Sequence, residues 1–119
     1  MRTAALGTIG VFFGVAGLYH LSAILLPSLG DHGSVLRHSV FVAIDGAVAV
    51  GLFFRPRFFF WFFTALGLQQ LHSHGSAFVH EWSIAHRLDW PSLLVLAIIP
   101  ITWSLLWFEY RQRPGAEAR

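Results

Sequence analysis

Residues 90–108, WPSLLVLAIIPITWSLLWF, form an apolar segment that contains no charged side chain. About 20 consecutive apolar residues are enough for an α-helix to cross the hydrocarbon core of a bilayer. Pro91 suits the first turn of such a helix, because the first helical residues need no N–H partner. This stretch therefore predicts a membrane-spanning helix.

Three further apolar runs precede it, and they predict spans at about residues 3–26, 35–54 and 58–79. Short segments rich in Pro, Gly and charged residues separate the runs, as is typical of turns. We read the first run as an uncleaved span, because it is longer than the apolar core of a usual signal peptide. We therefore expect an all-α protein, an integral membrane four-helix bundle that forms a single domain over residues 1–119.

The composition excludes several classes of protein and of site. Of the 119 residues, 55% are hydrophobic and 12% are charged, against roughly 25% charged residues in an ordinary soluble domain. The chain has no Cys, and Met1 is its one Met, so disulfides, thiolate clusters, cysteine nucleophiles and thioether copper sites are ruled out. The eight basic residues are scattered among apolar runs, so we expect no nucleic-acid partner.

The distribution of Arg predicts the orientation, because cytoplasmic loops and ends carry the excess of basic residues. Only Arg37 and Arg87 fall on one side of the predicted bundle. The other six fall on the opposite side: Arg2, Arg55, Arg57, Arg111, Arg113 and Arg119. This predicts cytoplasmic N- and C-termini. Because all eight basic residues are Arg, as is typical of high-GC bacterial genomes, we expect a multi-pass protein of the bacterial inner membrane.

The histidines gather on the outer half of the predicted bundle. They are His20, His32, His38, His72, His74, His80 and His86. Asp31, Glu81 and Asp89 fall in the same half, and Asp45 is deeper, near the middle of the second span. An Asp at the centre of a spanning helix costs roughly 2.5–3.5 kcal/mol. We therefore expect Asp45 to face protein or water.

Helical spacing predicts which side chains face inward. Gly7, Gly10, Gly14 and Gly17 form one stripe of small residues on the first span, and such stripes let helices approach closely in lipid. His20 continues this stripe, so we expect it in a helix interface. His38 and Asp45 are seven residues apart on the second span, which puts them on one face.

The third span leaves two histidines to choose between. Gln69, His72 and Ser76 form one polar stripe, whereas His74 lies on nearly the opposite side of a regular helix. The polar neighbours favour His72 as the inward residue. A break of the helix at Gly75 would weaken that choice, so which of the two faces the interior stays open.

These positions predict a transition-metal or haem site that is held by His20, His38 and His72, with Asp45 as a further metal ligand. Imidazole and carboxylate ligands suit iron, copper(II) or zinc, and a bis-histidine haem b fits the same residues. The chain would then act in a redox, electron-transport or metal-handling membrane assembly. The alternative for His20 and His38 is a pair of interfacial histidines that bond across helices. No motif assigns a catalytic residue.

A second interpretation makes the chain a non-catalytic accessory subunit around a larger membrane complex. The aromatic run from Phe58 to Phe63, preceded by Phe53 and Phe54, offers more surface than a bundle of this size can bury. The expected partners are membrane lipids, other membrane-protein subunits or further copies of the chain. A third and weaker interpretation is a proton or metal-ion path with Asp45 as the relay.

Overall fold

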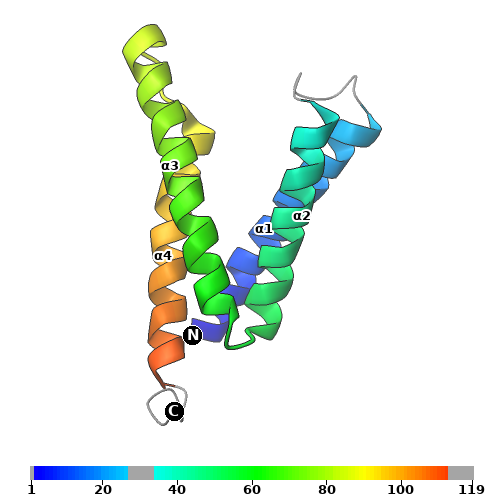
Figure 1. Cartoon of the computed structure of the whole chain (residues 1–119), viewed down its shortest axis with the longest axis vertical. Helices are drawn as coiled ribbons and strands as arrows, with labels where there is room; N and C mark the ends of the chain where they lie inside the picture. Colours follow the sequence, from blue (N-terminus) through cyan, green and yellow to red (C-terminus); the bar gives the residue numbers. More distant parts are fainter. Residues whose placement is uncertain (1, 27–33, 113–119) are drawn as a thin grey trace. The chain divides into compact units, whose positions relative to one another are not determined.

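A computed structural model describes residues 2–26 and 34–112 and shows four α-helices with no strand in these ranges (Figure 1). The helices are α1 (Arg2–Leu25), α2 (Val35–Phe54), α3 (Phe59–Ala85) and α4 (Trp90–Gln112). The predicted all-α fold with four helices is therefore confirmed. Asp31, His32, Arg113 and Arg119 lie outside the described residues.

Three helices are long and apolar enough to cross a membrane. They cover Thr3–Leu25, Val35–Phe54 and Trp90–Gln112. The structure therefore supports a multi-pass membrane protein. Helix α3 has 27 residues, about 40 Å of helix, but polar side chains interrupt its apolar sequence. That α3 also crosses the membrane, and that both termini are cytoplasmic, stay predictions.

Local sequence signals explain where α2 and α3 begin and end. The Ser34 hydroxyl caps α2 by accepting a hydrogen bond from the Arg37 N–H at 3.2 Å. Helix α2 ends at Arg55, whose φ of 49° is left-handed and whose N–H bonds to the Gly51 carbonyl. Helix α3 ends in the same way at His86, with φ 50°.

The chain forms two compact units, each of them a helical hairpin: α1 with α2, and α3 with α4 (Figure 1). In the first hairpin, glycines on α1 allow close approach to α2. A Cβ added at Gly17 would lie 3.3 Å from Asp45 Cβ, and one at Gly10 would lie 3.2 Å from the Phe53 ring. Gly14 departs from the expected stripe, because an added Cβ there meets no atom within 4 Å. The close contacts thus lie on either side of Gly14.

The second hairpin has a tight contact near its middle and an aromatic cluster toward one end. A Cβ added at Gly67 would lie 3.1 Å from Ile99 Cγ2, so α3 and α4 approach closely there. Farther along, the Phe60 ring stacks on Tyr110 at 4.9 Å between centroids. Phe63 is fully buried. These contacts set the register of α3 against α4.

Candidate functional site

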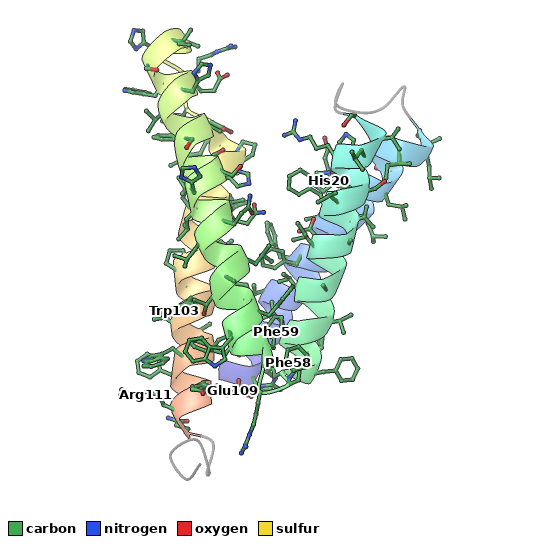
Figure 2. All side chains as sticks on the ribbon, viewed as in Figure 1. His20, Phe58, Phe59, Trp103, Glu109 and Arg111 are labelled. Atoms are coloured by element: carbon green, nitrogen blue, oxygen red, sulfur yellow. The ribbon has the colours of Figure 1, made fainter. Side chains whose placement is uncertain are left out.

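His20 and His38 meet across the first hairpin. His20 projects from α1 (Figure 2), and its Nδ1 lies 3.0 Å from Nδ1 of His38 on α2. Gly17, one turn before His20, lets the two helices approach closely enough for this contact. The structure therefore brings together two of the three predicted histidines.

The short distance constrains the protons on the two rings. A hydrogen bond between two ring nitrogens needs one N–H donor and one lone-pair acceptor, so only one of the facing Nδ1 atoms carries a proton. His38 is 2% exposed, and its Nε2 has no hydrogen-bond partner among the described residues. An unsatisfied buried polar group costs about 1–3 kcal/mol. His38 thus departs from the pattern of a fully bonded core histidine.

Phe41 supports the orientation of the pair. Its ring stacks on His20 at 4.8 Å between centroids and 18° between planes. The guanidinium carbon of Arg37 lies 5.8 Å from the centroid of the Phe41 ring. The His20 imidazole is therefore held by an aromatic face on one side and by the His38 nitrogen on another.

Asp45 is buried in the same interface, 8% exposed, on the α1-facing side of α2. This agrees with the face that Asp45 and His38 were expected to share. The seven-residue spacing puts Asp45 about 10.5 Å along the helix from His38. Within residues 2–26 and 34–112, no group of three or more His, Asp or Glu side chains is placed to hold a metal ion. A role for Asp45 as a ligand stays a prediction.

The two histidines of α3 have different surroundings. The His72 side chain is exposed, whereas His74 Nδ1 lies 3.1 Å from the Ser92 hydroxyl oxygen on α4. Within this hairpin it is therefore His74 that contacts the neighbouring helix. The assignment of His72 as a ligand of the predicted centre stays a prediction.

The His74 contact belongs to a network at the start of α4. The Ser92 hydroxyl donates to Asp89 Oδ2 at 2.5 Å, and Asp89 Oδ1 accepts from the Ser92 N–H at 3.2 Å. Because the hydroxyl proton goes to Asp89, His74 Nδ1–H donates to the Ser92 oxygen. A hydrolytic triad needs the imidazole between the carboxylate and the hydroxyl, and here the hydroxyl is in the middle. The network is a helix cap tied to α3.

The sequence pattern put Asp89 in the outer half of the predicted bundle, and the cap that Asp89 forms was not predicted. The signal was present, because an Asp directly before Trp90 and Pro91 is typical of a helix N-cap. The other two outer histidines of the described chain lie at the end of α3: His80 is exposed, and His86 forms the C-cap. Neither lies in a group that could hold an ion.

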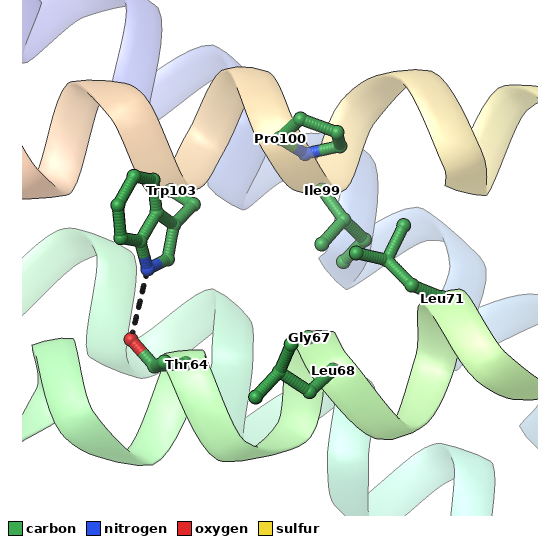
Figure 3. A pocket seen from close by; sticks show the side chains of 7 residues that line it. All are labelled: Thr64, Gly67, Leu68, Leu71, Ile99, Pro100 and Trp103. Atoms are coloured by element: carbon green, nitrogen blue, oxygen red, sulfur yellow. Dashed lines mark hydrogen bonds between the residues drawn. The ribbon is translucent and has the colours of Figure 1, made fainter.

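A cavity of about 230 Å³ lies between α3 and α4 (Figure 3). It is lined by Thr64, Gly67, Leu68, Leu71, Ile99, Pro100 and Trp103. The two polar groups of this lining are bonded to each other, because Trp103 Nε1 donates to Thr64 Oγ1 at 3.0 Å. The cavity thus presents an apolar wall without an open polar group of its own side chains.

Comparison with the models of known protein families, with curated proteins and with solved structures gives no match for this chain.

Proposed function

We propose that the chain is a small multi-pass membrane protein that binds a divalent transition-metal ion between the Nδ1 atoms of His20 and His38. The observation that carries the proposal is their separation of 3.0 Å. Two nitrogen ligands about 2.0–2.1 Å from one ion lie about 2.9–3.4 Å apart when they occupy adjacent octahedral or tetrahedral positions. An ion can therefore replace the shared proton with little movement of the helices.

The same distance bears on the choice between a single ion and haem b. Two axial nitrogens on opposite sides of a haem iron are about 4 Å apart, twice a metal–nitrogen bond length. A separation of 3.0 Å favours one ion over a haem b held by both histidines. Iron, copper(II) and zinc all suit imidazole ligands.

In this proposal the pair supplies two ligands, and ligand roles for His72 and Asp45 stay predictions. Loss of metal from the Asp45→Asn variant would support a ligand role for the carboxylate, whereas a small change in affinity would support an orienting role. The ion would serve a redox or metal-handling assembly in the bacterial inner membrane, as the sequence predicts. No residue is assigned a catalytic step.

The test is metal binding by the full chain purified in detergent and stripped with a chelator. Zinc is titrated against a coloured competitor, bound zinc per chain is measured by mass spectrometry, and an absorption spectrum checks for haem. We expect His20→Ala and His38→Ala each to lose at least tenfold in affinity, because each removes one of two ligands. His80→Ala is the matched control, since this exposed histidine lies outside the pair. Equal zinc affinity in all three variants would overturn the proposal.

A second candidate function, that of an accessory subunit, is favoured by the exposed aromatic side chains. Phe59, Phe60 and Phe63 of the aromatic run are buried. The exposed ones are Phe53, Phe54, Phe58, Trp61 and Phe62, with exposed fractions between 43% and 78%. Such a surface suits lipid or another membrane subunit. A metal-free protein that is extracted only together with stoichiometric subunits would favour this function over the metal site.

A further inference from the structure

One face of α3 is polar and exposed along much of its length. Its members are Gln69, His72, Ser73, Ser76, His80 and Ser83, and all six are exposed. At 100° per residue these positions fall within an arc about 100° wide. We call them the α3 polar face.

The α3 polar face points away from α4. The residues of α3 that contact α4 include Phe60 against Tyr110, Gly67 against Ile99 and His74 against Ser92. These three positions lie about 140–180° around the helix from Gln69. The partner helix of the hairpin therefore leaves the polar face uncovered.

The contacts with α4 also give the depth of Gln69 and His72. Gly67 is level with Ile99, and His74 is level with Ser92. Gln69 and His72 lie between these two levels, beside a segment of a helix that is long and apolar enough to span a membrane. Polar side chains at such a depth are found facing protein or water and not lipid.

The amides at this level are only partly bonded within the hairpin. Gln70 Nε2 donates to Gln69 Oε1 at 2.9 Å. This bond leaves the Gln69 amide nitrogen as a donor and the Gln70 carbonyl oxygen as an acceptor for a further partner. Next to them, a shallow hollow runs past His72, Gly75 and Ser76. Small residues at such a position let a second helix approach closely.

We propose that the α3 polar face is the interface with a second copy of this chain. Two copies with the same membrane orientation are related by a twofold axis along the membrane normal, so each residue meets its own counterpart at the same depth. The face suits such a partner because its amide and hydroxyl groups can each both donate and accept a hydrogen bond. The Gln69 amide nitrogen then donates to Gln69 Oε1 of the other copy, which keeps one lone pair after accepting from Gln70.

The absence of cysteine from the chain makes disulfide crosslinking a clean test. Single-cysteine variants Ser73→Cys and Ser76→Cys are oxidised with iodine in native membranes, and dimers are counted on a non-reducing gel. Because each chain carries one cysteine, a disulfide-linked dimer reports two copies. Leu68→Cys is the matched control, since Leu68 is 65% exposed on α3 but lies outside the polar face.

We expect at least fivefold more dimer from Ser73→Cys and Ser76→Cys than from Leu68→Cys, at high and at low expression. Adding Gln69→Leu to Ser76→Cys should lower the dimer yield several-fold, whereas Gln112→Leu, at the end of α4, should leave it unchanged. Equal yields at the three cysteine positions, or an effect of Gln69→Leu no larger than that of Gln112→Leu, would overturn the proposal. So would crosslinking of Ser76→Cys to a different protein. Metal binding is not needed for any of these readouts.

Discussion

At Gly17 the nearest atoms of the first hairpin are a Cβ and backbone atoms of α2, which cannot swing aside like the Phe53 ring beside Gly10, so Gly17→Leu is an informative change. An added Cβ would lie 3.3 Å from Asp45 Cβ and 3.9 Å from the Val42 carbonyl oxygen. The remaining carbons of Leu would have to enter the same interface, and overpacking of this kind typically costs about 1–3 kcal/mol. That free energy corresponds to about a 5- to 150-fold shift in an equilibrium constant.

Hydrogen exchange followed by mass spectrometry measures this effect separately in each hairpin. We expect faster exchange of the α1 and α2 amides in Gly17→Leu, by about 5- to 150-fold where exchange follows opening of the hairpin. Gly14→Leu is the control, because an added Cβ at Gly14 meets no atom within 4 Å. The zinc affinity of Gly17→Leu should also fall, since His20 follows one turn later. Equal exchange in the two variants would refute the assigned interface.

Three other predictions concern the second hairpin and the orientation. Ser92→Ala removes the hydroxyl between His74 and Asp89, so it should cost about 0.5–1.5 kcal/mol and speed hydrogen exchange in the first turn of α4. Ser104→Ala, which loses a bond within α4, should not affect that turn. A double-mutant cycle of Trp103→Phe with Thr64→Val in SDS-induced unfolding should show a coupling of about 0.6 kcal/mol for the bond from Trp103 to Thr64; additive effects would contradict it. A cysteine at Ser83 should react with an impermeant thiol reagent from outside intact cells, and one at Gly115 should not; the reverse pattern would invert the predicted orientation.

The sequence predicts the helices well because apolar runs and turn residues mark their positions, and it predicts α2 with the bounds observed, residues 35–54. For two other helices the predicted C-terminal ends fall too early in the chain. The predicted span 58–79 continues to Ala85, and the predicted span 90–108 continues to Gln112. Apolarity reports where a chain leaves the hydrocarbon, whereas a helix ends where its backbone hydrogen bonds stop, as at His86. Both helices therefore extend past their apolar segments.

The pairing of His20 with His38 could be predicted because both clues are local. The glycine stripe gives the interface side of α1, and the seven-residue spacing gives one face of α2. The contact at Gly17 and the opening at Gly14 could not be predicted, because helical spacing gives the direction of a side chain but not its distance from the neighbouring helix. That distance depends on the packing of both helices.

The surroundings of His72 could not be predicted from helical periodicity alone. The spacing separates His72 from His74 correctly, but polar residues lie on both sides of α3, so spacing alone does not tell which side meets α4. In the structure, His74 contacts α4 and His72 lies on the α3 polar face. The two roles for His72 predict different results for His72→Ala. A ligand role predicts loss of zinc with unchanged crosslinking of Ser76→Cys, whereas the interface role predicts unchanged zinc with reduced crosslinking.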